Sequence, residues 1–228
     1  MKITFLGHSA CLVETRDHHL LIDPFITGNS MSTFQADDIS CDFILLTHGH
    51  ADHFGDTEAL AKRNDATVIA NFELAGYCET KGLKNHPMHI GGSASFPFGE
   101  VKLTIAHHGS SLPGPDGLPI YLGEPAGILI KAEGKTIYHA GDTGLFLDMQ
   151  LIGQMNTIDV ALLPIGDNFT MGPEDALKAI EFLRPKKVIP IHYNTFPPIE
   201  KDPHEFAQAA NLCNTEAVVL ESGQSIEV

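Results

Sequence analysis

A cluster of ionisable side chains lies within the segment ILLTHGHADHFG, residues 44–55. His48, His50, Asp52 and His53 follow directly after a run of aliphatic residues. Alternate residues of a strand point to the same side, so His48 and His50 converge just beyond the run. Neutral imidazole is a good ligand for zinc and neighbouring divalent metals, and a carboxylate compensates their charge. We therefore predict a metal site at the carboxyl end of this strand, where α/β folds usually place ligands.

Further donors follow apolar runs downstream. They are His107 and His108 in LTIAHHGSS, His139 and Asp142 in TIYHAGDTG, and His192 in VIPIHYNTF. Together with the first cluster they supply enough ligands for two metals side by side. In such a site a carboxylate can bridge the metals, and a shared water becomes a nucleophile near neutral pH.

The composition limits the classes of function. The chain has 228 residues with 43% hydrophobic content, which suits one globular domain with a sizeable core or two tightly fused halves. We expect a single domain, residues 1–228. Its net charge of −15 argues against sequence-independent binding to nucleic acid or to an anionic membrane. No apolar run is long enough to predict a transmembrane helix. The scattered cysteines and the strand-like N-terminus, without a signal-peptide core, predict reduced thiols and a cytoplasmic location.

The elements that must position these donors are short strands and amphipathic helices. Apolar runs rich in β-branched residues, such as KITFLG, FILLTH, AGILIKA and KVIPIHY, predict strands. Helical patterns lie between some of them, in residues 55–64, 71–82, 172–185 and 202–213. Residues 26–41 and 109–125 predict long surface loops, which in compact domains are often functional. Periodicity by itself supports only a mixed α/β class.

The ordered motifs resemble a known family. HxHxDH at residues 48–53, a later histidine, GDT with Asp142, and His192 resemble the metallo-β-lactamase-fold hydrolases over nearly the whole chain. THGHADH, HAGDTGLF, PIGDNFTMGPEDA and PIHYNTFP look like a branch of metal-dependent hydrolases related to the ascorbate-6-phosphate lactonases. The resemblance implies an α/β fold built as a four-layer αβ/βα sandwich. Two mixed β-sheets would pack face to face, flanked by helices, with the metals at one edge.

The resemblance also implies a complete ligand set for two divalent ions. The set divides as follows: His48, His50 and His108 would hold the first metal, Asp52, His53 and His192 the second, and Asp142 would bridge them. Zinc is the first expectation for such donors, and manganese, iron or nickel also suit them.

The doublet at His107 and His108 offers two candidates for one ligand position. Leu103, Ile105 and His107 share one strand face, which is apolar, so His107 could lie over the core while His108 begins the turn. Strand phase leaves this choice open. The family pattern, an alanine, any residue and then the ligand, favours His108.

Other polar residues compete for roles around the site. His8, in LGHSA, is either structural or, as the resemblance implies, a group near the metals that contributes to catalysis. Asp23, in LLIDP, either shapes the turn before Pro24 or accepts a hydrogen bond from a ligand imidazole and so orients that ring. His139 is expected to be structural. For Asp167, Asn168 and Thr170, in GDNFTMGP, turn and capping roles compete with a role in the site.

The expected reaction is hydrolysis of a small ester, lactone or phosphoester by a metal-bound hydroxide. Asp52 or Asp142 would orient the water or carry a proton, although metal-bound carboxylates make weak bases. The alternatives are a metallo-nuclease or phosphodiesterase, and a metal-dependent binding protein without turnover. We expect a small-molecule substrate rather than nucleic acid or a membrane, and leave open whether the chain forms a homo-oligomer.

Overall fold

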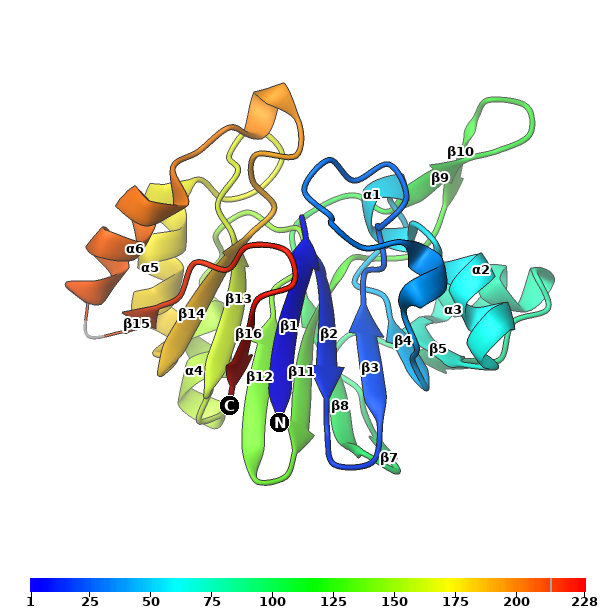
Figure 1. The fold of residues 1–228 in the computed structure, drawn as a ribbon, viewed down its shortest axis with the longest axis horizontal. Helices are drawn as coiled ribbons and strands as arrows, with labels where there is room; N and C mark the ends of the chain where they lie inside the picture. Colours follow the sequence, from blue (N-terminus) through cyan, green and yellow to red (C-terminus); the bar gives the residue numbers. More distant parts are fainter. Residues whose placement is uncertain (214) are drawn as a thin grey trace.

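Two seven-stranded sheets form the centre of the computed structural model, which describes residues 1–213 and 215–228. The first sheet has the strand order β16-β1-β2-β3-β4-β5-β6, and the second has the order β15-β14-β13-β12-β11-β8-β7 (Figure 1). A separate two-stranded hairpin, β9-β10, projects from the body (Figure 1). Each large sheet contains both parallel and antiparallel pairs.

The strands of the first sheet are β1 (Lys2–Gly7), β2 (Ala10–Glu14), β3 (His19–Ile22), β4 (Phe43–Leu45), β5 (Thr67–Asn71), β6 (Asn85–Met88) and β16 (Ser225–Glu227). Those of the second are β7 (Ser93–Phe96), β8 (Gly99–Ile105), β11 (Ala126–Ala132), β12 (Lys135–His139), β13 (Val160–Pro164), β14 (Lys187–Ile191) and β15 (Glu216–Ala217). The hairpin consists of β9 (Ser111–Pro113) and β10 (Pro119–Tyr121). The helices are α1 (Ala51–Phe54), α2 (Thr57–Asn64), α3 (Phe72–Thr80), α4 (Met149–Met155), α5 (Pro173–Leu183) and α6 (Pro203–Asn211), with short 3-10 turns at Ala36–Asp38 and Pro197–Ile199.

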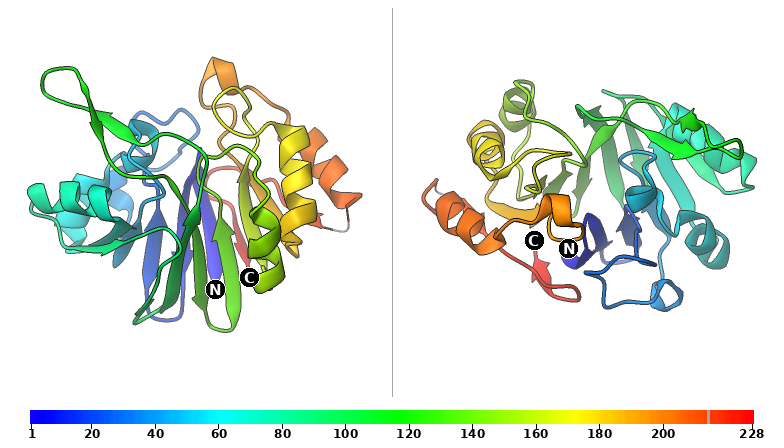
Figure 2. Two further views of the ribbon diagram at one scale, coloured as in Figure 1. Left: turned by 180° about the vertical axis from the view of Figure 1, so that it is seen from behind. Right: turned by 90° about the horizontal axis from the view of Figure 1, so that it is seen from above.

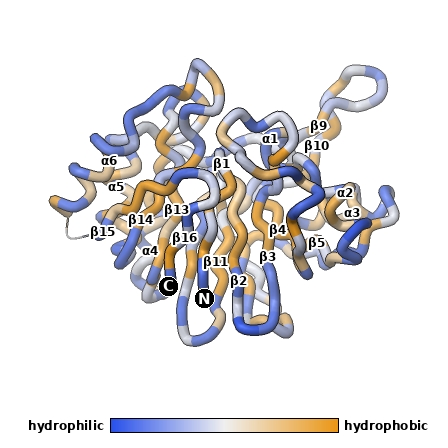
Figure 3. The backbone as a smooth tube through the Cα atoms, in the orientation of Figure 1, coloured by the Kyte–Doolittle hydropathy of each residue, from blue (hydrophilic) through white to orange (hydrophobic). Residues whose placement is uncertain are grey.

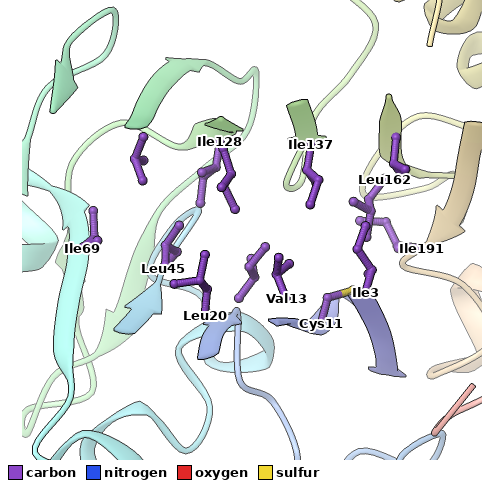
Figure 4. Close-up of a cluster of buried hydrophobic side chains, with 14 of the residues drawn as sticks. Ile3, Cys11, Val13, Leu20, Leu45, Ile69, Ile128, Ile137, Leu162 and Ile191 are labelled. Carbon is purple, nitrogen blue, oxygen red and sulfur yellow. The ribbon is translucent and has the colours of Figure 1, made fainter. Parts of the chain in front are cut away.

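The inner faces of the two sheets share one apolar core. Val13 and Leu20 from the first sheet lie in the same cluster as Ile128, Ile137 and Leu162 from the second (Figure 4). Alternation along each strand sends these side chains inward and their neighbours outward, which is the usual pattern of a face-to-face sheet pair. Figure 3 shows that hydrophobic residues are concentrated along the strands, whereas many of the connecting loops are hydrophilic.

The outer faces of both sheets are apolar as well, because helices cover them. On the first sheet, Ile44 and Val68 pack with Leu60 of α2 and Leu74 of α3. On the second sheet, α4, α5 and α6 cover a comparable cluster (Figure 2). The order of layers is therefore helix, sheet, sheet, helix, and the predicted four-layer αβ/βα sandwich is confirmed.

Strand direction explains why the polar loops meet at one edge. In the first sheet, β2 runs antiparallel to β1 and β3, whereas β3 and β4 run parallel. The carboxyl ends of β1, β3 and β4 consequently lie together, and they are followed by His8, Asp23 and His48. The adjacent sheet repeats the arrangement, since β8, β12, β13 and β14 all run in one direction. His108, Asp142 and His192 follow three of these strands.

The predicted helices at residues 55–64, 71–82, 172–185 and 202–213 are all present with shorter bounds. The prediction of a plain loop over residues 109–125 is wrong in part, since β9 and β10 form within it. Weak apolar patterns explain why β6 and β7 escaped the sequence analysis: β7, for example, reads SASF. The sequence analysis also missed α4, which reads MQLIGQM. Among the described residues, no helix combines the length and the apolar character needed to cross a membrane.

Candidate metal centre

The first donor group comes from two sheets. Ring nitrogens of His48, His50 and His108 lie within 4.8 Å of one another. His48 Nε2 is 3.0 Å from His50 Nδ1, and the ring of His108 approaches both edge-on, with centroids 5.1 and 5.0 Å away. His48 is buried, whereas His50 and His108 are partly exposed toward solvent. This is the trio that the family resemblance implies for the first metal.

The second donor group contains one residue more than the prediction. Asp52, His53 and His192 lie close together as expected, and His8 completes the set within the same 4.8 Å limit. His53 and His192 stack with their ring planes 17° apart. His192 has a φ of 53°, an uncommon left-handed conformation for a residue other than glycine, and its amide donates to the carbonyl of His8 over 2.9 Å.

Asp142 lies between the two groups. Its Oδ1 is 3.2 Å from His53 Nε2, and its Oδ2 is 2.9 Å from His192 Nε2 and 3.4 Å from His108 Nε2. The carboxylate therefore touches donors of both groups, although more than thirty residues separate it from each of them in the sequence. This is the position that a bridging ligand requires.

Asp23 orients the histidines from behind. His53 Nδ1 donates to Asp23 Oδ2 over 2.8 Å, and both groups are fully buried. Thr47 gives its amide to Asp23 Oδ1 and its hydroxyl to Asp23 Oδ2, over 2.8 and 2.6 Å. The Thr47 hydroxyl is also 2.9 Å from His48 Nδ1, from which it accepts. One carboxylate thus directs the outer nitrogens of His53 and His48, so that their Nε2 atoms face the site.

His8 is buried directly behind Asp52. Its Nε2 is 3.2 Å from Asp52 Oδ2, and its Nδ1 is 2.8 Å from Thr195 Oγ1. Burial lowers the pKa of His8 to about 4, so the ring is neutral and can donate from Nε2 to the carboxylate. The structure therefore places His8 against a predicted ligand and away from solvent.

Burial and the contacts between side chains determine which groups in the site are neutral and which are charged. Burial lowers the pKa of His48 well below its ordinary value, and the nearby charge of His53 acts in the same direction. Burial also lowers the pKa of His50 and of His108. These imidazoles are neutral, which is the form that binds metals.

The carboxylates remain ionised despite their burial. Burial acts to raise the pKa of Asp142, but His53 and His192 outweigh it and hold the pKa well below the usual range. For Asp52 the hydrogen bond from His8 outweighs burial in the same way. Burial acts to lower the pKa of His53, but the charges of Asp142 and Asp23 raise it well above normal. In the metal-free site, the charge of His53 thus compensates the buried carboxylates of Asp142 and Asp23.

The donor set fits divalent metal ions. His53 Nε2 and Asp142 Oδ1 are buried, face each other, and lack a hydrogen bond of good geometry to any residue that the structure describes. Unpaired buried polar atoms are costly, and a shared cation would satisfy both. The combination of imidazole and carboxylate donors matches zinc and its neighbours in the first transition series.

A cavity of about 260 Å³ opens onto these donors. Its lining residues are His50, Asp52, His108, Asp142, Phe169 and His192. The cavity gives a small molecule access to the face of the cluster opposite Asp23 and His8, which take no part in the lining.

The structure also shows the surroundings of three other polar residues that the sequence analysis considered. His107 is exposed and meets Phe146 edge-on, so the expectation that it lies over the core is wrong. His139 is structural, as predicted: it is buried, its Nε2 contacts the Ser9 carbonyl at 3.0 Å, and its Nδ1 accepts from the Gly141 amide. Asp167 is an exposed residue with positive φ, and its side chain accepts a hydrogen bond from the Asn168 amide in a turn.

Comparison with known proteins agrees with this site. The family model of the beta-lactamase superfamily domain matches residues 18–193. The chain is 60% identical to a UPF0173 metal-dependent hydrolase of Geobacillus sp. strain WCH70 over 228 residues, which is 100% of both chains. It is 58% identical to the UPF0173 metal-dependent hydrolase YtkL of Bacillus subtilis, again over 100% of both.

The chain belongs to the UPF0173 metal-dependent hydrolases. This family lies within the metallo-β-lactamase superfamily, so the predicted resemblance is confirmed. Among solved structures, the chain is similar to Igni18, a metallo hydrolase from the archaeon Ignicoccus hospitalis, with 40% identity and a TM-score of 0.90. That match covers 99% of this chain and 97% of Igni18.

The sequence analysis of this family member missed three contributors to the site. Thr47 links Asp23 to His48, Thr195 contacts His8, and Phe169 lines the cavity. Thr47 carried a usable signal, because a polar residue that ends an apolar strand just before a ligand is well placed to hold that ligand. Thr195 and Phe169 lie in segments that the sequence analysis already considered, but their residue types gave no reason to single them out.

Proposed function

We propose that this UPF0173 member is a dinuclear metal hydrolase, with zinc as the first candidate, acting on a small ester, lactone or phosphoester. The observation that carries the proposal is Asp142, whose carboxylate touches donors of both groups at 2.9 to 3.4 Å. We assign the predicted ligands as before: His48, His50 and His108 to one ion, Asp52, His53 and His192 to the other, and Asp142 to both.

Two divalent ions held here would polarise a carbonyl or phosphoryl oxygen and lower the pKa of a water between them. The protein's own contribution is to hold the donors in place. Asp23 and Thr47 fix the rings of His53 and His48, and His8 fixes Asp52 by a hydrogen bond. Asp52 also borders the cavity, where its carboxylate can accept a hydrogen bond from an attacking water and orient it.

The test compares metal content with turnover. Protein purified without chelators is analysed for metals, then assayed with panels of lactones, carboxylic esters, phosphodiesters and single-stranded DNA. We expect about two ions per chain and turnover of a small substrate. Asp142→Asn should bind one ion or fewer and lose activity. Asp148→Asn, an equivalent charge change at an exposed position, should retain both.

Several outcomes would contradict the proposal. Full activity of a protein without metal would exclude the mechanism. Cleavage of DNA alone would favour a nuclease. Two bound ions with no turnover of any panel member would favour a metal-dependent binding protein.

A further inference from the structure

Phe169 is a large apolar side chain in an unusual place. Its side chain remains 53% exposed, yet it borders the cavity over the proposed metal ligands. The other lining residues are imidazoles and carboxylates, so Phe169 provides the apolar wall. An exposed aromatic ring beside a reaction centre is available to bury a substrate's apolar surface.

The loop between β13 and α5 holds Phe169 in this position (Figure 1). Asp167 and Asn168 have φ values of 63° and 53°, so the backbone turns back sharply just before the ring. The Asp167 amide donates to the Met171 carbonyl over 3.0 Å, and the Asn168 amide to Asp167 Oδ1 over 2.9 Å. Lys201 pairs with the same side chain, 3.3 Å from Asp167 Oδ2.

The loop is also tied to the metal ligands. The Met171 amide donates to the carbonyl of Thr143 over 2.9 Å, and Thr143 directly follows Asp142. Met171 itself is 1% exposed and anchors the loop in the core. The position of Phe169 relative to Asp142 is therefore determined by backbone contacts.

The charge around the cavity indicates what the ring would contact. The segments at this edge, residues 26–41, 109–125, 140–148 and 165–172, contain aspartate and glutamate but neither lysine nor arginine. Lys201 is engaged with Asp167. These segments therefore offer an anionic substrate no lysine or arginine to pair with, whereas an uncharged apolar group would meet the ring of Phe169.

We propose that Phe169 determines specificity by packing against an aryl or branched alkyl group next to the scissile bond of an uncharged ester, lactone or thioester. This inference rests on the proposed hydrolysis and narrows it from phosphoryl to carbonyl substrates. Contact with a non-reacting part of the substrate positions the scissile carbonyl over the donor cluster.

The test uses two matched pairs of probes on metal-loaded protein. The first pair is γ-phenyl-γ-butyrolactone and γ-butyrolactone, compared by kcat/KM. The second is benzohydroxamate and acetohydroxamate, metal-chelating ligands compared by calorimetric Kd. In the wild type, the phenyl member of each pair should be favoured. Phe169→Ala should reduce each preference about tenfold, and Phe169→Leu by less.

Phe72→Ala is the matched control, because Phe72 is 55% exposed and lies outside the cavity lining. It should leave both preferences unchanged, and the metal content of all variants should equal that of the wild type. A preference that survives Phe169→Ala would overturn the inference, as would a wild type that cleaves phosphoesters in preference to both lactones.

The hydroxamate pair separates this inference from the proposed function. A metal-loaded protein that cleaves no lactone, ester or phosphoester but loses its benzohydroxamate preference in Phe169→Ala would refute the hydrolase proposal and retain the apolar subsite. Protein that takes up no metal would contradict both.

Discussion

Adjacent histidines in this chain have opposite environments. β8 ends at Ile105, and the backbone then bends, so His107 and His108 no longer follow the alternation of the strand. His108 turns toward Asp142, with Nε2 3.4 Å from Oδ2, whereas His107 is exposed beside Phe146. Strand alternation left open which of the two histidines is the ligand. The geometry supports His108, which is the residue that the family pattern favours.

We predict that His108→Ala loses metal and activity, because it removes a donor from the first group. His107→Ala should keep its full metal content and at least half of the wild-type turnover. Elemental analysis and kcat/KM of both variants provide the measurement. The reverse result, with metal lost only from His107→Ala, would show that the ligand assignment is wrong.

Asp23 would act on a bound metal only through other residues, since it contacts His53 and Thr47 and does not line the cavity. We predict that Asp23→Asn lowers metal affinity by about 10- to 100-fold while every donor remains in place, since His53 and Thr47 lose their charged acceptor. Asp42→Asn is the control, because Asp42 also accepts a backbone hydrogen bond, from the amide of His19, but lies outside the site. Competition with a metal-sensitive chelator measures both affinities. Equal affinities in the two variants would exclude this role for Asp23.

At the scale of elements, the β9-β10 hairpin has a fixed base and a free tip. Ser110 Oγ accepts from the Gly49 amide over 3.0 Å and donates to the Leu122 carbonyl over the same distance. The base is therefore bound to the loop that carries His48 and His50. The tip projects away from the body (Figure 1), and none of residues 111–121 lines the cavity.

Shortening residues 112–118 should consequently leave both metals bound. We predict that it changes KM or substrate preference, because the hairpin begins beside the cavity and can contact the outer part of a substrate. Kinetics on several lactones, together with metal analysis, provide the test. Unchanged kinetics would restrict the pocket to the loops that line it, and metal loss would mean that the hairpin supports the site.

Helices α4 and α5 approach each other at Gly153. A Cβ atom there would lie 2.7 Å from Leu183 Cα, so Gly153→Ala should destabilise the protein by about 1–3 kcal/mol. Gly76→Ala is the matched change, since Gly76 lies in α3 with nothing within 4 Å of an added Cβ. It should stabilise by roughly 0.5–1 kcal/mol through helix propensity. Urea unfolding measures the change in the free energy of unfolding for both variants. Two changes of the same sign would refute this packing argument.

At the scale of the whole molecule, the buried histidines should make the metal-free fold sensitive to acid. Burial lowers the pKa of His8 from 6.5 to about 4 and also lowers that of His139, whose Nδ1 must stay unprotonated to accept from Gly141. The unfolded chain binds more protons than the folded chain between these values. The contribution of these two histidines to the free energy of unfolding is therefore fully present above pH 6.5, and it falls as the pH drops toward 4.

His53 contributes with the opposite sign, because its pKa is raised: its stabilisation is complete below 6.5 and is lost at higher pH, as the pH rises through the folded value. It therefore does not protect against acid below 6.5. We predict that the free energy of unfolding of chelator-treated protein falls by up to about 3 kcal/mol between pH 7 and pH 4, as measured by urea denaturation. His139→Gln should weaken this dependence. A flat profile would exclude the buried histidines as its cause.

Much of this protein can be predicted from local sequence. The HxHxDH spacing, the positions of His108, Asp142 and His192 after apolar runs, and the proline-led helices at residues 172–185 and 202–213 all depend on short-range patterns. Strand alternation and helix capping are determined by neighbouring residues, so they can be read directly from the chain. The family resemblance added two further predictions, the four-layer sandwich and the division of the donors between two metals.

Tertiary structure decided the rest, because those features depend on contacts between distant residues. Asp23 reaches His53 across 30 positions, and His8 reaches Thr195 across 187. Phe169 became a candidate for substrate contact only when strand direction brought its loop beside Asp142. Such contacts leave no periodic signal in the sequence, since they arise from the packing of two sheets whose carboxyl ends share one edge.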